Sequence, residues 1–101
     1  MIIMPEKLMC EMEKNPNKFL VASYLIFKTT YNEERKQYEC DFGYISALKF
    51  FENKYEGITH KKLQTIMKQL IAEGYFEVVR KGTSKNNPTI LKNLIYEQYE
   101  E

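Results

Sequence analysis

The stretch of residues 58–76 constrains the fold more than any other part of the chain, because it combines a helical apolar pattern with clear start and stop signals. Its apolar residues recur at intervals of three and four positions, which places them on one side of a helix; they are Leu63, Ile66, Met67, Leu70 and Ile71. Thr59 is a suitable N-cap, and Gly74 stands where helices commonly end in a left-handed residue. The sequence therefore predicts an amphipathic helix over residues 59–73 that packs one side on a core.

A hairpin is predicted directly after this helix. Residues 75–80 favour a strand, and a second apolar run covers residues 89–91. The loop between them is basic and contains Gly82 and an Asn-Pro step, which are turn signals. A helix, a glycine, a strand, a basic loop and a strand thus follow one another.

The earlier part of the chain supplies further short elements. Residues 5–14 favour a short helix, and residues 19–27 are apolar almost all round, which predicts a helix in the middle of the core. Residues 32–36 predict a polar turn, and residues 38–42 alternate as a short strand.

A helix is also predicted over residues 44–55. Its inward residues are expected to be Ile45, Leu48 and Phe51, together with Phe50 or Tyr55. The short turn that follows contains Gly57 and leads into the helix at residues 59–73, so the two helices form a helix-turn-helix unit.

These elements predict an α+β fold with a three-helix core, a small β-hairpin and an extra N-terminal helix. A length of 101 residues suits one domain over residues 1–101. Residues 1–15 then form a helical extension, and residues 93–101 form a C-terminal tail that offers a dimerisation surface.

The charge of the chain is unevenly distributed, although the total is only +1. Residues 59–92 hold seven basic and two acidic side chains, a net charge of +5, whereas residues 1–58 carry −1 and residues 93–101 carry −3. A basic segment that coincides with an amphipathic helix and a hairpin favours binding to nucleic acid. The alternative is a lysine surface that is simply solvated.

Residues of the helix at 59–73 and of the loop can serve as donors to DNA. Lysines there can meet guanine edges or phosphates, the amide of Gln64 suits adenine, and a basic hairpin suits phosphates or the minor groove. The residues expected to bind DNA are Thr59, His60, Lys61, Lys62, Gln64, Thr65, Lys68, Arg80, Lys81, Thr83, Ser84, Lys85, Asn86 and Asn87. The alternatives are a surface histidine without a role at His60 and an ordinary polar turn in the loop.

Other kinds of function have little support in the sequence. There is no glycine-rich phosphate loop and no nucleophile beside a base, and the two cysteines and one histidine are too few and too dispersed for a metal site, so we expect neither an enzyme nor a cofactor. Aromatic residues make up 14% of the chain, but they fall mostly at core spacing, which disfavours stacking on single-stranded bases. Cys10 and Cys40 are expected to be partly buried thiols in a cytoplasmic protein without a signal peptide, a membrane span or a small-molecule ligand.

The order of elements resembles the winged helix-turn-helix family over about residues 17–92. The resemblance is carried by Ile58-Thr59 before the third helix, by the apolar pattern within it, and by Glu73-Gly74-Tyr75-Phe76 at its exit. The loop from Gly82 to Pro88 is similar to the wing of phage and plasmid replication initiators and of small bacterial regulators, although Leu91 stands where an aromatic residue is expected.

The expected function is sequence-specific binding of double-stranded DNA. The helix at 59–73 would read the major groove, and the wing at 80–88 would contact the backbone or the minor groove. Such a protein acts by occupying its site, as a transcription regulator or as a DNA replication or plasmid partition factor of a mobile element. The alternative is a winged-helix module that binds an acidic protein partner instead of DNA.

A homodimer is also expected, because two half-sites multiply discrimination between DNA sequences. The apolar residues outside the predicted core would hold it together: Leu8, Met9, Met12, Leu94, Ile95, Tyr96 and Tyr99. In a monomer, these residues would instead fold back on the core.

Overall fold

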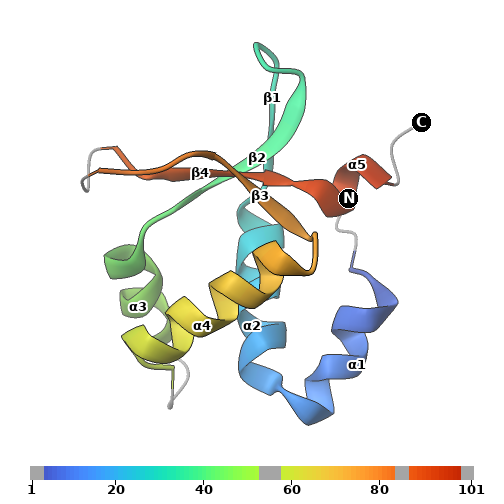
Figure 1. Ribbon diagram of the computed structural model, residues 1–101, viewed down its shortest axis with the longest axis vertical. Coiled ribbons are helices and arrows are strands. Elements are labelled where there is room, and N and C mark those ends of the chain that lie inside the picture. The colour runs from blue at the N-terminus through green and yellow to red at the C-terminus, as the bar shows by residue number, and fades with distance from the viewer. Residues whose placement is uncertain (1–3, 53–57, 84–86, 99–101) are drawn as a thin grey trace.

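An antiparallel sheet and a layer of helices beneath it form the described part of the protein, which comprises residues 4–52, 58–83 and 87–98 of a computed structural model. The elements are α1 (Glu6–Lys14), α2 (Pro16–Lys28), β1 (Thr30–Asn32), β2 (Gln37–Phe42), α3 (Tyr44–Glu52), α4 (His60–Ala72), β3 (Phe76–Arg80), β4 (Thr89–Asn93) and α5 (Leu94–Gln98). Figure 1 shows α2, α3 and α4 on one side of the sheet, while the β1–β2 hairpin projects beyond it. The expectation of an α+β fold is confirmed.

The four strands lie in the order β1-β2-β4-β3, and every neighbouring pair is antiparallel. Strand β4 lies between β2 and β3; Cys40 and Val78 both pair with Leu91. Strands β2 and β4 are therefore neighbours in the sheet, although α3, α4 and β3 lie between them in the chain. This arrangement places the β3–β4 hairpin at one end of the sheet, next to α3 and α4 (Figure 1).

Strand β1 was not predicted from the sequence, which suggested only a turn in this region. Tyr31 pairs with Tyr38 across the hairpin, with ring centroids 5.1 Å apart, and Tyr38 in turn contacts Tyr96 of α5 at 5.2 Å. Aromatic cross-strand pairs stabilise short hairpins. A strand of three residues is too short to show the alternating pattern by which strands are recognised in a sequence.

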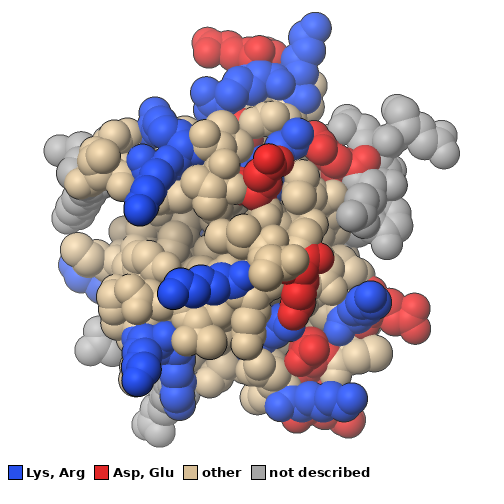
Figure 2. Space-filling view, in the orientation of Figure 1, with Lys and Arg blue, Asp and Glu red and all other residues tan. Residues whose placement is uncertain are grey.

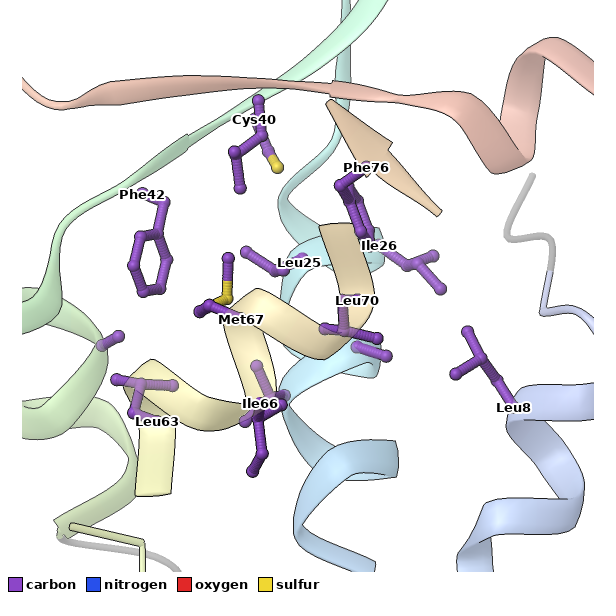
Figure 3. Close-up of a cluster of buried hydrophobic side chains, with 14 of the residues drawn as sticks. Leu8, Leu25, Ile26, Cys40, Phe42, Leu63, Ile66, Met67, Leu70 and Phe76 are labelled. Atoms are coloured by element: carbon purple, nitrogen blue, oxygen red, sulfur yellow. The ribbon is translucent and has the colours of Figure 1, made fainter. Parts of the chain in front are cut away.

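The apolar stripe of α4 packs into the centre of the core. Leu63 and Leu70 are fully buried, and they meet side chains from α2 and from the sheet, as Figure 3 shows. Ile66 and Met67 are also buried, whereas Ile71 lies at the edge of the stripe and is 36% exposed. The predicted amphipathic helix is thus confirmed, with a slightly narrower apolar side.

Helix boundaries follow the capping signals in the sequence. The side chain of Asn15 accepts a hydrogen bond from the backbone N–H of Lys18 at the start of α2, and the side chain of Thr59 accepts one from Lys62 at the start of α4. Gly74 has φ of +84°, which confirms the expected left-handed stop after α4.

Several predicted core positions prove to be exposed. Phe51 is buried and Leu48 half-buried against the core, as predicted, but Ile45 is 63% exposed because α3 turns Ala47 inward in its place. Phe27 is 78% exposed on the outer side of α2. Both helices have apolar residues on more than one side, so their pattern does not determine which side faces the core. Tyr55 and Gly57 lie outside the described residues.

The residues predicted to form a dimer interface differ in their exposure, because the fold buries some of them and leaves others at the surface. Leu8, Ile95 and Tyr96 are buried in the core of their own chain, so they are not available to a partner, and their assignment to an interface is corrected. Leu94 is half-buried, while Met9 and Met12 are about half exposed on α1. Tyr99 lies outside the described residues.

The short helix α5 folds back because Asn93 connects it to α2. Asn93 is fully buried; its side-chain oxygen accepts the N–H of Tyr96, and its amide donates to the hydroxyl of Thr29 at 3.0 Å. Because the oxygen and the nitrogen of this buried amide are both hydrogen-bonded, Asn93 fixes the position of the chain after β4. No helix in the described ranges is long and apolar enough to cross a bilayer.

Candidate nucleic-acid interface

The outward side of α4 carries a row of polar and basic side chains. Burial of the apolar stripe turns the opposite side to solvent, so all the predicted contact residues of this segment are exposed: Thr59, His60, Lys61, Lys62, Gln64, Thr65 and Lys68. In Figure 2, Lys and Arg side chains gather on the left of this face, over the first part of α4 and the hairpin end of the sheet, while acidic side chains lie toward the centre and right, over β3 and the end of α4.

The lysines on this surface are free of ion pairs with the described residues. None of Lys61, Lys62, Lys68 and Lys81 has a carboxylate within 4.0 Å there. Glu73, the acidic residue at the end of α4, is held at 2.5 Å by the buried Lys18. The positive charge of the surface is therefore not neutralised by its own helix.

Lys92 is the exception within the basic segment. Its amine lies 3.1 Å from the carboxylate of Glu97 in α5. The pair lies on the sheet, away from the outward side of α4, so Lys92 contributes less to the basic surface than its place in the sequence suggests.

The β3–β4 hairpin is closed by its own hydrogen bonds. The N–H of Gly82 donates to the hydroxyl of Thr89 at 2.9 Å, and the N–H of Thr83 donates to the carbonyl of Asn87 at 3.0 Å. A side chain at Gly82 would bring its Cβ within 2.4 Å of the backbone nitrogen of Thr89, so only glycine fits this close approach.

The residues of the β3–β4 hairpin that were predicted to bind DNA differ in their exposure and hydrogen bonds. Arg80, Lys81 and Thr83 are exposed, whereas Asn87 is half-buried and its amide donates to the hydroxyl of Thr83 at 2.9 Å. Thr83 and Asn87 thus bind each other within the hairpin. Arg80 also donates to the carbonyl of Pro88 at 3.4 Å, and Ser84, Lys85 and Asn86 lie outside the described residues.

His60 is not an isolated surface side chain. Its ring lies 5.0 Å from the ring of Tyr44, the first residue of α3, and burial raises the pKa of that tyrosine. The contact holds the beginning of α4 against α3, which gives His60 a structural partner in addition to any DNA contact.

Three residues beside this surface were missed in the sequence. A hollow of about 470 Å³ lies between the start of α2 and α4, and its lining includes Asn15, Asn17 and Gln69 in addition to the predicted Lys61, Lys62 and Thr65. Gln69 could have been found, because it lies seven positions after Lys62 and thus on the same side of the helix. The asparagines are far away in the sequence, so no local pattern indicates them.

The cysteines of the chain are both free thiols, one exposed and one buried. Cys10 is exposed, which corrects the expectation that it is partly buried. Burial raises the pKa of Cys40 to about 12, so its thiol stays protonated and is a poor nucleophile at neutral pH. Among the described residues, no group of His, Cys, Asp and Glu side chains could hold a metal ion.

Comparison with known proteins found no match to a family model, to a curated protein or to a solved structure. Function must therefore be inferred from the placement of the chain's own side chains.

Proposed function

We propose that the protein binds double-stranded DNA as a winged helix-turn-helix domain, with α4 in the major groove and the β3–β4 hairpin on the backbone or in the minor groove. The order α2, β2, α3, α4, β3 and β4 supports the winged-helix assignment, since β4 pairs with both other strands of this set. The additional β1 extends the sheet at its far edge and leaves this arrangement intact.

The observation that carries the proposal is the outward side of α4. It presents three lysines, an amide and a hydroxyl along one helix, and the nearest acidic residue of that helix is already bound by Lys18. A helix is narrow enough to enter the major groove of B-DNA, where such groups can meet base edges and phosphates. The exposed Arg80 and Lys81 add positive charge at the hairpin.

Binding would act by occupation of a site. Within this proposal, the protein is a transcription regulator or a replication or partition factor of a mobile element. The basic surface is the part of the molecule that would contact the DNA. A basic surface can also bind an acidic protein, so the test must separate the two partners.

The test is the salt dependence of affinity for a mixed-sequence duplex, with a double variant on α4. Counterion release predicts that the logarithm of the binding constant falls linearly with the logarithm of the salt concentration, with a slope of about −0.9 per phosphate contact. Lys61→Gln with Lys68→Gln should weaken binding and flatten this slope. The matched control, Lys7→Gln with Lys36→Gln, removes the same charge from exposed positions on α1 and in the β1–β2 turn and should retain most of the affinity.

Absence of duplex binding at low salt would overturn the proposal. Binding to polyglutamate that exceeds binding to the duplex, and that depends on the same two lysines, would favour an acidic protein partner instead.

A further inference from the structure

The hollow between α2 and α4 has the chemistry of an anion site. Its lining side chains are Asn15, Asn17, Lys61, Lys62, Thr65, Ile66 and Gln69, which include two amines and three amides but no carboxylate. Amines and amides are the groups that bind phosphate oxygens in DNA complexes.

Three side chains of this hollow have donors that no described residue uses. In the described part of the chain, the side chains of Asn17, Lys62 and Gln69 make no hydrogen bond or ion pair. Asn15 uses its side-chain oxygen to cap α2, which leaves its NH₂ group as a donor. Thr65, by contrast, donates to the carbonyl of Lys61.

Lys18, beside the hollow in the sequence, binds two acidic side chains. Lys18, which follows Asn17 in α2, is 6% exposed and holds Glu73 at 2.5 Å and Glu11 at 3.9 Å. This buried amine therefore draws two carboxylates toward itself, and none of them lines the hollow. An anion in the hollow would meet two amines and no carboxylate among the lining side chains.

The hollow and the hairpin lie on opposite flanks of α4. In Figure 1, the described part of the β3–β4 hairpin lies above α4 in the view, and the turn between α1 and α2 lies below it. A helix in the major groove has a phosphate backbone on each side. One flank of α4 would then face one strand of the duplex, and the other flank would face the second strand.

We propose that the hollow formed by Asn17, Lys62 and Gln69 binds a backbone phosphate of the DNA strand on the flank of α4 opposite the β3–β4 hairpin. This inference rests on the proposed DNA binding and adds a second phosphate contact to it. It assigns Lys62 and Gln69 to the backbone and Gln64 and Lys68 to the groove between the two strands. Lys61 and Thr65 line the hollow on the side that faces the groove.

Two variants test the site without removing a buried group. Lys62→Gln removes one charge from an exposed position, and Asn17→Asp places a carboxylate in the first turn of α2, where acidic residues stabilise a helix. Lys62→Gln should flatten the salt slope on a mixed-sequence duplex by about 0.9, the value for one lost phosphate contact. Asn17→Asp should weaken binding at low salt at least tenfold through repulsion, while thermal unfolding shows an intact protein.

Side-chain amide signals give a direct reading of contact. In ¹⁵N-labelled protein, the NH₂ signals of Asn17 and Gln69 should shift when the duplex is added. The same shifts should occur when the duplex is added to the Lys81→Gln variant, because that substitution lies on the other flank of α4. Lys7→Gln serves as the control of equal charge and should keep the slope of the unchanged protein.

The outcomes separate this site from the function on which it rests. Failure of the unchanged protein to bind the duplex would overturn both proposals. Normal duplex binding with an unchanged slope in Lys62→Gln and without shifts at Asn17 and Gln69 would overturn the phosphate site alone.

Discussion

Glu39 is a buried carboxylate that the protein keeps charged. It is 6% exposed, and the guanidinium of Arg35 binds both of its oxygens, at 2.7 and 2.8 Å. Asn32 and Gln37 donate to it as well. The hydrogen bonds from Arg35 are the main cause that lowers the pKa of Glu39, and those from Gln37 and Asn32 lower it further. These hydrogen bonds tie the turn end of the projecting β1–β2 hairpin to Glu39 of β2.

The lowered pKa of Glu39 predicts how stability depends on pH. A carboxyl group whose pKa is lower in the folded protein contributes stability above its unfolded pKa, about 4.3 for glutamate, and loses it as the pH falls through the folded value. Glu39→Gln should therefore be less stable than the unchanged protein at pH 7, and the difference should shrink below about pH 4. Urea unfolding between pH 7 and pH 3 measures this. A difference that stays constant down to pH 3 would show that the charge of Glu39 contributes nothing.

At the scale of elements, the β3–β4 hairpin depends on one glycine. The approach of Gly82 to the backbone of Thr89 leaves no room for a Cβ, whereas the Cβ of an alanine at Gly74 would meet no atom within 4 Å. Gly74 is needed only for its positive φ. The two glycines therefore offer a matched pair of substitutions with different physical costs.

Gly82→Ala should destabilise the protein by about 2–3 kcal/mol, at the upper end for single substitutions, because the backbone of β4 must move. Gly74→Ala should cost about 1–2 kcal/mol, the strain of a left-handed alanine. If the hairpin contacts DNA, Gly82→Ala should also weaken duplex binding under conditions where both variants are folded. Equal affinities of the two variants would place the hairpin away from the DNA.

The two elements that we propose to bind DNA should also differ in what they recognise. Gln64 on α4 can bind a base edge, so Gln64→Ala should cost about 1–3 kcal/mol on a duplex selected for tight binding and less on random DNA. Lys81→Ala with Lys85→Ala should weaken both duplexes alike and flatten the salt slope by about 0.9 per lost contact. Anisotropy titrations on the two duplexes make the comparison. Equal losses for Gln64→Ala on both would refute its role as a base reader.

How far the sequence predicted these elements depends on how local their determinants are. The cap at Thr59, the apolar stripe of α4 and the stop at Gly74 lie within one short segment, and all three were predicted correctly. On α3, Phe51 and Leu48 were predicted correctly as inward, but Ile45 was wrong, because Ile45 and Ala47 both fit a helical pattern and only packing chooses between them. Asn17 and Lys62 both line the hollow beside α4. They lie far apart in the sequence, so only the tertiary structure brings them together and no local pattern indicates it.

The whole molecule leaves apolar side chains on its surface that a second copy could cover. Met9 and Met12 of α1 are 53% and 52% exposed, and Phe27 of α2 is 78% exposed. The predicted homodimer can no longer involve Leu8, Ile95 or Tyr96, so α1 must supply the contact through its methionines if the N-terminal helix forms the interface. Two-fold pairing would match a palindromic site.

Substitution of both methionines tests this interface. Met9→Glu with Met12→Glu should convert a dimer to a monomer, because carboxylates would face one another across the axis, whereas Phe27→Glu should leave the dimer intact. Sedimentation at micromolar concentration distinguishes a monomer of 12.1 kDa from a dimer. A monomeric unchanged protein would contradict the prediction of a homodimer, and loss of the dimer in Phe27→Glu alone would move the interface to α2.

The central claim is that the outward side of α4 binds duplex DNA, and mapping of backbone amide signals on addition of a mixed-sequence duplex tests it most directly. The claim predicts that the largest shifts fall on α4 between His60 and Lys68 and on the hairpin at Arg80 and Lys81, with little change in the exposed residues of α1. Shifts confined to α1 or to the outer side of α2, with those of α4 unchanged, would contradict it.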